Sequence, residues 1–203
     1  MRRTKEEAEV TRKTLLEAGL KVFSRKGYAD TTLDDIAEEA GVTRGAIYHH
    51  FGNKAELYNA VLVEGWKRII PAVERGIAEG SNGLEQLKRS FVYFVKFAVE
   101  DDTFRAINEL MLFKTPMSEE LEEGMEIKRR GMRGGIHNVA EFVRKGIADG
   151  SIRPDVNPLD VGIMIITLQN GLVATWLLDP KLFSITERAE AMADIFFSGL
   201  AAQ

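Results

Sequence analysis

The sequence contains no cysteine, only three histidines and no apolar run near its N-terminus. The lack of cysteine excludes disulfides, zinc–thiolate sites and thiol redox sensing. Three histidines alone leave little for a transition-metal sensor, so we expect no metal and no cofactor. The first seven residues are mostly charged, and we therefore expect no secretory signal. These features fit the reducing cytoplasm.

One apolar stretch, residues 161–178, is long enough to be tested as a membrane span. Its length is near the lower limit for a helix that crosses a bilayer. Gln169 and Asn170 lie near its centre, and Asp160 and Asp179 flank it. Central amides are unfavourable in lipid. We expect a buried helix of a protein dimer here and no membrane association.

The sequence also has no excess of positive charge. Its formal net charge is −4. Residues 1–60 hold ten Lys or Arg and ten Asp or Glu, so residues 61–203 carry the whole net charge. Nucleic-acid-binding domains are usually basic. Bulk charge therefore gives no indication of nucleic-acid binding, and only the placement of individual charges could.

Apolar residues at helical spacing are present along almost all of the 203 residues, without a long alternation of period two. We predict an all-α fold of about nine helices, enough for one small and one medium domain. The predicted helices cover residues 5–26, 32–40, 43–50, 53–79, 84–100, 103–114, 118–149, 157–178 and 185–201.

Short local patterns predict where helices begin and end. Thr32 with Asp35, and Asn53 with Glu56, have the spacing of N-terminal capping boxes. Thr43 is predicted to cap the helix that follows it. These three helix starts lie within about twenty residues of one another, and each presents backbone N–H groups that can bind an anion.

Glycine and proline predict the interruptions. Gly27 should end the first helix, and Pro71 should kink or break the 53–79 helix. Four glycines between residues 124 and 135 weaken the 118–149 helix, where a break is expected.

The segment 33–51 has the spacing of a helix-turn-helix. Ala37 is small where a second helix must cross, and Gly41 lies at the turn, where a left-handed backbone favours glycine. The residues expected to be buried are Ile36, Ala37, Val42, Ile47 and Phe51. An ordinary helical hairpin with the same spacing is the alternative.

The exposed side of the second helix has the chemistry of a DNA-reading surface. Arginine can donate two hydrogen bonds to guanine, and glycine allows close approach of the backbone. Threonine, tyrosine and histidine suit phosphate oxygens. The predicted DNA-contacting residues are Thr32, Thr43, Arg44, Gly45, Tyr48, His49 and Lys54. Tyr48 as half-buried filler and Lys54 as a solvated lysine are the alternatives. Arg2, Arg3 and Lys5 are expected to form a flexible basic arm.

Three segments closely resemble the TetR family of transcriptional repressors: TTLDDIA at 31–37, AGVTRGAIYHHF at 40–51 and KAEL at 54–57. A weaker resemblance continues at 107–110, 171–172 and 176–178. Within the family, the sequence is similar to repressors of multidrug efflux pumps of the AcrR and TtgR type. The resemblance implies a nine-helix fold, two-fold dimerisation through the last two helices, and a ligand cavity in the C-terminal domain.

Two asparagines lie on apolar stripes of predicted helices. Asn108 shares its stripe with Phe104 and Ile107, and Asn170 shares one with Ile166 and Val173. Each could be an amide satisfied between helices or an orienting group in an apolar ligand pocket. The resemblance favours the pocket for Asn108, since similar repressors have a ligand-contacting asparagine there. The predicted effector-contacting residues are Trp66, Phe91, Phe94, Asn108, Leu112, Asn170 and Trp176. At the positions flanking Asn108 this sequence has Leu112 and Phe113, with none of the histidines found there in some relatives, and this departure puts the ligands of those relatives in doubt for this chain.

We therefore predict a DNA-binding domain at 1–52 and an effector-binding and dimerisation domain at 53–203. The predicted protein is a homodimeric repressor that binds operator duplex DNA and is released by a lipophilic small molecule, with an efflux pump gene as a candidate target. The predicted dimer contacts are Leu168, Leu172, Ile195 and Phe196. An effector-independent DNA-binding regulator and an activator are the alternatives. An enzyme is not expected, because no phosphate loop or nucleophile motif is present.

Overall fold

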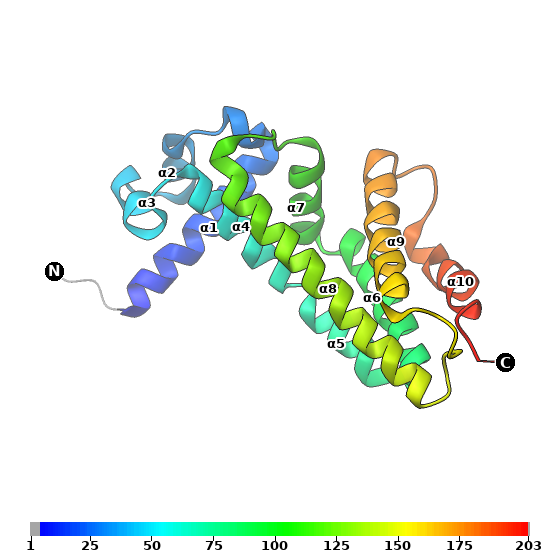
Figure 1. Ribbon diagram of the computed structural model, residues 1–203. Coiled ribbons are helices and arrows are strands. Elements are labelled where there is room, and N and C mark those ends of the chain that lie inside the picture. Colours follow the sequence, from blue (N-terminus) through cyan, green and yellow to red (C-terminus); the bar gives the residue numbers. More distant parts are fainter. Residues whose placement is uncertain (1–4, 203) are drawn as a thin grey trace. The chain divides into compact units, whose positions relative to one another are not determined.

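The computed structural model describes residues 5–202, which form an all-helical protein (Figure 1). Its helices are α1 (Lys5–Asp30), α2 (Leu33–Ala40), α3 (Arg44–Phe51), α4 (Lys54–Lys67), α5 (Ile70–Glu79), α6 (Gly83–Glu100), α7 (Asp102–Phe113), the 3-10 helix η1 (Glu119–Leu121), α8 (Glu122–Ala148), α9 (Pro158–Leu178) and α10 (Ile185–Ser198). The predicted all-α class is confirmed. Arg2 and Arg3 of the predicted basic arm lie outside the described residues.

The extra helix relative to the predicted nine comes from Pro71. Proline has no N–H to donate and clashes with the preceding turn, so it is tolerated only in the first turn of a helix. Here it lies in the first turn of α5, and the predicted 53–79 helix is broken after Lys67. The predicted interruption at Pro71 is confirmed.

The other two predicted interruptions have different outcomes. Gly27 has φ 79° and ψ 170°, a conformation that favours glycine, and one further turn continues α1 to Asp30. The expected break among the glycines of the 118–149 helix is wrong, because α8 runs without interruption from Glu122 to Ala148. Helix propensity is a weak preference, and these glycines do not break the helix although Gly131 and Gly134 face open space.

The described residues form two compact units. The first comprises the chain up to Lys67 together with Ala106–Glu126, and the second comprises Arg68–Arg105 and the chain from Ile127 onward. The division falls inside α7 and α8, which each contribute residues to both units. By packing, α4 and residues 106–126 belong with the N-terminal helices. The predicted boundary after residue 52 separates a DNA-binding from an effector-binding part, and it stays a prediction.

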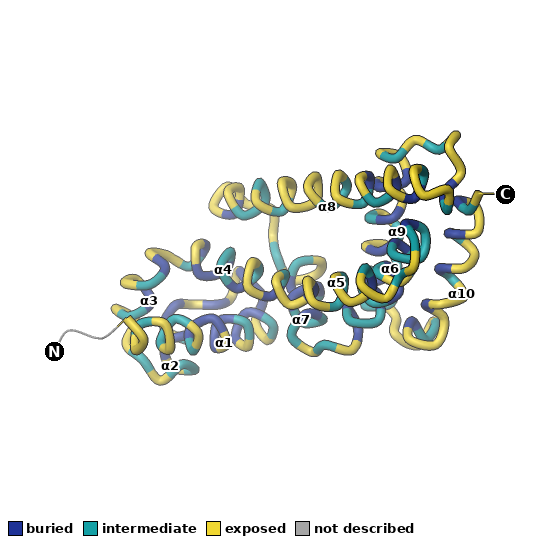
Figure 2. Tube along the Cα trace, turned by 90° about the horizontal axis from the view of Figure 1, so that it is seen from below, coloured by how far each residue is buried: buried dark blue, intermediate teal, exposed yellow. Residues whose placement is uncertain are grey.

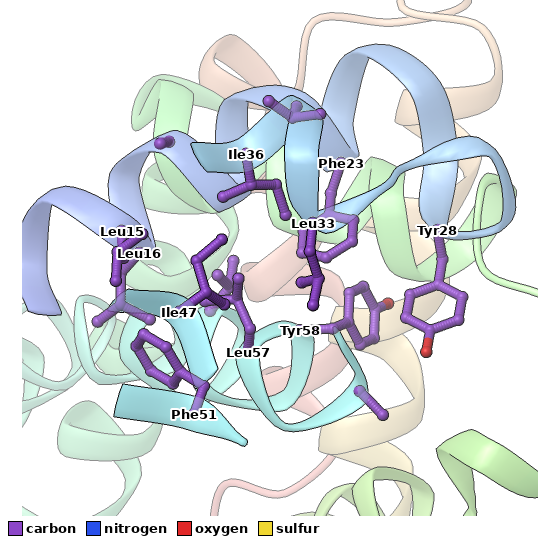
Figure 3. Close-up of a cluster of buried hydrophobic side chains, with 14 of the residues drawn as sticks. Leu15, Leu16, Phe23, Tyr28, Leu33, Ile36, Ile47, Phe51, Leu57 and Tyr58 are labelled. Atoms are coloured by element: carbon purple, nitrogen blue, oxygen red, sulfur yellow. The ribbon is translucent and has the colours of Figure 1, made fainter. Parts of the chain in front are cut away.

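The core of the first unit is built around α1, α2, α3 and α4. Figure 3 shows Phe23, Ile36, Ile47 and Tyr58, one from each of these helices, converging on this core. The Phe23 ring stacks on Tyr28 at 5.9 Å between centroids and meets Tyr58 edge-on at 5.2 Å. These three rings pack the C-terminal end of α1 against α4.

The segment after α7 is bonded to the end of α1. The Tyr28 N–H donates to the Lys114 carbonyl at 3.0 Å, and the Lys114 ammonium donates to the Ser24 carbonyl at 2.6 Å. Leu110 and Leu121 are buried in the same core as the N-terminal helices. Residues far along the chain thus complete the first unit.

The second unit has a separate core among α6, α8, α9 and α10. It is centred on Phe91 and Phe197, whose rings meet at 5.8 Å, with Val143 and Ile165 in the same cluster. Figure 2 shows buried and exposed residues alternating along α10, as expected for a helix with one covered face. This core fixes the positions of α9 and α10.

Candidate DNA-binding surface

Helices α2 and α3 form the predicted helix-turn-helix, and its first helix begins with a complete capping box. The Thr32 hydroxyl accepts from the Asp35 N–H at 3.1 Å, and the Thr32 N–H donates to the Asp35 carboxylate at 3.0 Å. An ion pair with Lys26 and these bonds lower the pKa of Asp35 to about 2. The carboxylate therefore stays ionised at neutral pH and fixes the start of α2.

The turn between the two helices has the predicted geometry. Gly41 has φ 65°, its N–H donates to the Glu38 carbonyl at 3.1 Å, and the Val42 N–H donates to the Ala37 carbonyl at 3.0 Å. Ile36, Ala37, Ile47 and Phe51 are buried, as predicted, and Val42 is half-buried. These contacts fix α3 by one side and leave its other side exposed.

The exposed side of α3 carries the residues predicted to contact DNA. Thr43, Arg44, Gly45, Tyr48 and His49 are all exposed. Thr43 occupies the N-cap position with extended backbone but makes no capping hydrogen bond with its side chain, whereas Asn53 caps α4 through the Glu56 N–H at 2.8 Å. The first-turn N–H groups of α3 therefore have no side-chain cap.

Gly45 is not required by the packing of the protein itself. A Cβ added at this position would meet only the Thr43 hydroxyl oxygen, at an ordinary contact distance of 3.7 Å. The absence of a side chain here therefore leaves open surface on α3. Such a surface suits the close approach of another molecule to the helix backbone.

Arg44 is held by two neighbours. Its Nε and Nη2 donate to the Tyr48 hydroxyl at 3.3 and 2.8 Å, and its Nη1 donates to the Asp34 carboxylate at 3.1 Å. The Tyr48 hydrogen bonds and the charge of Asp34 raise the pKa of Arg44. Tyr48 is thus not a filler residue: it is exposed and orients the arginine. The contact with Asp34 was not predicted from the sequence.

Lys54 occupies an unexpected position. Its ammonium donates to the carbonyls of Tyr28 and Thr31 at 3.1 and 3.0 Å and lies 4.4 Å from the centre of the Tyr28 ring. Lys54 therefore caps the C-terminal end of α1 and is half-buried. It is not the solvated lysine of the alternative interpretation, and its contact with phosphate stays a prediction.

The predicted effector-contacting residues divide between the two units. Trp66, Asn108 and Leu112 lie in the first unit, where Asn108 is buried, Trp66 half-buried and Leu112 exposed. The other four lie in the second unit and are Phe91, Phe94, Asn170 and Trp176.

The four residues of the second unit differ in burial. Phe91 belongs to the core beside Phe197, while Phe94 and Trp176 are half-buried. Asn170 is exposed in the protomer, and the neighbouring Gln169 is the buried amide of α9. The effector assignments therefore stay predictions, with Asn108 the buried amide among them.

An apolar groove of about 720 Å³ runs along α9 and α10 within the second unit. Its lining includes the predicted dimer contacts Leu168, Leu172, Ile195 and Phe196, together with Met164. Ile195 is 79% exposed and Met164 55% exposed. By length and composition alone, α9 could cross a membrane. In the most apolar 18-residue stretch of α9, 28% of the residues are buried in the protomer, so much of this apolar surface is uncovered.

No group of three or more His, Cys, Asp or Glu able to hold a metal ion is present among residues 5–202.

Comparison with known protein families gives two matches along the chain. Residues 15–61 match the bacterial regulatory proteins of the tetR family. Residues 82–201 match the C-terminal region of MAATS-type transcriptional repressors. Together these regions include residues of both compact units.

Relatives match over almost the full length. The chain is 30% identical over 200 residues to the probable HTH-type transcriptional regulator ArpR of Pseudomonas putida, covering 96% of this chain and 93% of ArpR. It is 29% identical to the HTH-type transcriptional regulator TtgR, also of Pseudomonas putida, with the same coverage. The crystal structure of NalD, the secondary repressor of the MexAB-OprM multidrug efflux pump in Pseudomonas aeruginosa, superimposes with a TM-score of 0.83 at 29% identity, over 96% of this chain and 97% of NalD.

Proposed function

The chain belongs to the TetR family of bacterial regulatory proteins, whose members are transcriptional repressors, and we propose that it is a homodimeric repressor released from operator DNA by a lipophilic small molecule. Its relatives are transcriptional regulators and not enzymes. A protein with this function works where the DNA is, in the cytoplasm, and α9 then serves dimerisation and not membrane insertion.

The observation that carries the proposal is the exposed face of α3. Arg44, Gly45 and Tyr48 share it, at the end of a helix-turn-helix whose buried side is fully packed. An α-helix fits the major groove of DNA, and an arginine there can bind guanine through two hydrogen bonds. In a symmetric dimer, the two DNA-binding domains (the headpieces, residues 1–52) would read two half-sites of a pseudo-palindromic operator.

The sharpest test removes the arginine from this face. We expect Arg44→Ala to weaken operator binding by about 1–3 kcal/mol and to relax the sequence preference at one or two base pairs. Tyr48→Phe should produce part of this effect, because it removes the hydroxyl that holds the guanidinium. Gel-shift titration against a duplex selected by the wild-type protein measures both. Normal binding by an Arg44→Ala, Tyr48→Ala double variant would rule out this reading face.

Release by a ligand is the second part of the proposal. NalD, similar over nearly the whole chain, is a repressor of a multidrug efflux pump, which supports a lipophilic effector and an efflux pump gene as target. Asn108 is a buried amide on α7, the helix that also carries the buried Phe104 and Ile107. Ligand pockets combine apolar walls with a few such polar groups.

We expect Asn108→Leu to weaken binding of polar aromatic effectors while operator binding stays near wild type. Leucine is of similar size to asparagine but cannot donate or accept a hydrogen bond. Isothermal titration with a panel of dyes and plant phenolics measures the affinities, which we expect in the micromolar range, about −7 to −9 kcal/mol. Unchanged binding of every compound would show that Asn108 is a structural amide.

Effector and operator must also affect each other equally. By linkage, a compound that weakens operator binding must itself bind less tightly to the operator complex, by the same factor. The same titrations repeated with operator-bound protein measure this coupling. A protein that binds none of the compounds but represses normally would be the effector-independent regulator.

A further inference from the structure

Asp34 is the one acidic residue in contact with the arginine of the proposed reading face, within the described part of the chain. It lies in the first turn of α2, and its carboxylate accepts a hydrogen bond from Arg44 Nη1 at 3.1 Å. The side chain of Asp34 is 69% exposed and that of Arg44 is 52% exposed. The pair is therefore on the surface that a bound duplex would cover.

The ion pair itself contributes little to folding, and Asp34 as a first-turn acid stabilises α2 through the helix dipole without needing Arg44. The capping box at the start of α2 is made by Asp35, and Asp34 takes no part in it. Exposed ion pairs between flexible side chains contribute little to stability. A carboxylate beside a DNA-reading arginine also repels phosphate, so Asp34 has a consequence for DNA binding besides its place in the first turn of α2.

The chemistry of the guanidinium suggests how Asp34 affects binding. It has five N–H donors in a fixed plane. One bond from each of Nε, Nη1 and Nη2 goes to Tyr48 or Asp34, which leaves two N–H groups for another acceptor. Two donors are what guanine requires at its O6 and N7 atoms. The arginine is thus held by two neighbours, with one N–H on each of Nη1 and Nη2 outside these bonds.

The charge of Asp34 affects the contacts of Arg44 with phosphate and with guanine differently. Attraction to phosphate is Coulombic and independent of sequence. A carboxylate at 3.1 Å offsets part of the guanidinium charge that a phosphate would meet. Hydrogen bonds to the neutral acceptors of guanine depend instead on orientation. Asp34 therefore weakens the first kind of contact more than the second.

We propose that Asp34 is a specificity-determining residue, which keeps Arg44 oriented for a base and unavailable to phosphates of arbitrary sequence. This inference rests on the proposed DNA-binding function. It predicts that Asp34→Asn binds non-operator DNA more tightly and discriminates less well between bases. Discrimination at the base pair read by Arg44 should fall at least about fivefold.

The experiment uses the full-length protein with two fluorescent duplexes that differ at one base pair and a third of random sequence. One is a site enriched from a random library by the wild-type protein, and the other is the same site with the Arg44-dependent guanine replaced. Fluorescence anisotropy gives both affinities at several salt concentrations, together with that for a random-sequence duplex. Glu38→Gln is the matched control, because Glu38 is an exposed acid on the same helix with no ion pair among the described residues. Asp34→Glu tests rescue by a conserved charge.

The inference is supported if Asp34→Asn loses discrimination, Glu38→Gln keeps it, and Asp34→Asn has no further effect on discrimination in an Arg44→Ala background. It is overturned if Asp34→Asn and Glu38→Gln shift all affinities by the same factor. It is also overturned if Asp34→Asn reduces discrimination equally without Arg44. A wild-type protein that enriches no sequence overturns the proposed function as well, an outcome distinct from unchanged selectivity of Asp34→Asn.

Discussion

A variant with Met164→Asp and Ile195→Asp is expected to be a monomer and to bind a two-half-site operator roughly 100-fold more weakly, or worse. Both residues line the groove along α9 and α10 and are largely exposed in the protomer. An obligate interface is large and apolar, and burying an unpaired carboxylate in it costs several kcal/mol. A monomer also loses the gain from two linked headpieces.

Sedimentation at micromolar concentration and gel-shift titration measure the two effects. Met117→Asp is the matched control, since Met117 is 93% exposed and lies in the first unit, whereas α9 and α10 belong to the second. It should leave both association and operator binding unchanged. A wild-type protein that sediments as a monomer would contradict the dimer, and a dimeric double-aspartate variant would contradict this interface.

The second large effect is expected from Phe23→Ala. Phe23 is fully buried and contacts the rings of Tyr28 and Tyr58 at the junction of α1 and α4. Removing a buried phenylalanine costs about 3–5 kcal/mol. Since whole domains are stable by only about 5–15 kcal/mol, much of the stability of the first unit should be lost, and operator binding with it.

Thermal unfolding gives the total loss, and hydrogen exchange with peptide mass spectrometry gives its location. Peptides from α2 and α3 should lose protection while those from α6 and α10 keep it, because the second core is separate. Phe23→Leu should cost much less, since leucine fills most of the cavity. Equal loss of protection in both units would mean that they unfold together, against this prediction.

Local chemistry explains which features could be predicted from the sequence. Capping at Thr32 and Asn53, the turn at Gly41 and the break at Pro71 each depend on residues within a few positions of one another. The pattern of buried residues in the helix-turn-helix follows from helical periodicity. These short-range predictions are confirmed except at Val42, which is half-buried, and at Thr43, whose side chain makes no capping hydrogen bond.

The contacts that the sequence does not reveal are those between distant residues. Asp34 and Arg44 are ten residues apart with a turn between them, and Lys54 reaches carbonyls 23 and 26 residues earlier. No sequence spacing indicates such pairs, because they depend on how the helices pack. The sequence identifies Arg44 and Lys54 as cations near the reading helix but cannot show that each already has partners.

Helical spacing also leaves the covered face of a helix undetermined. The sequence places Ile166, Asn170 and Val173 on one apolar stripe of α9, yet Asn170 is exposed and only Val173 is buried in the protomer. A helix that is apolar on most sides has several faces that could be covered. The packing shows that α9 covers the side with Val161, Ile165, Gln169 and Val173 instead.

The hydrogen bonds between Lys114 and the end of α1 bear on how such proteins can be recombined. Because Leu110 and Leu121 complete the N-terminal core, residues 1–52 do not contain all the residues of that core. A chimera that joins residues 1–52 to the C-terminal part of a relative would bring a foreign α7 end against Gly27 and Tyr28. Exchange of DNA specificity between relatives is therefore better made by grafting the exposed side chains of α3 than by swapping the whole headpiece.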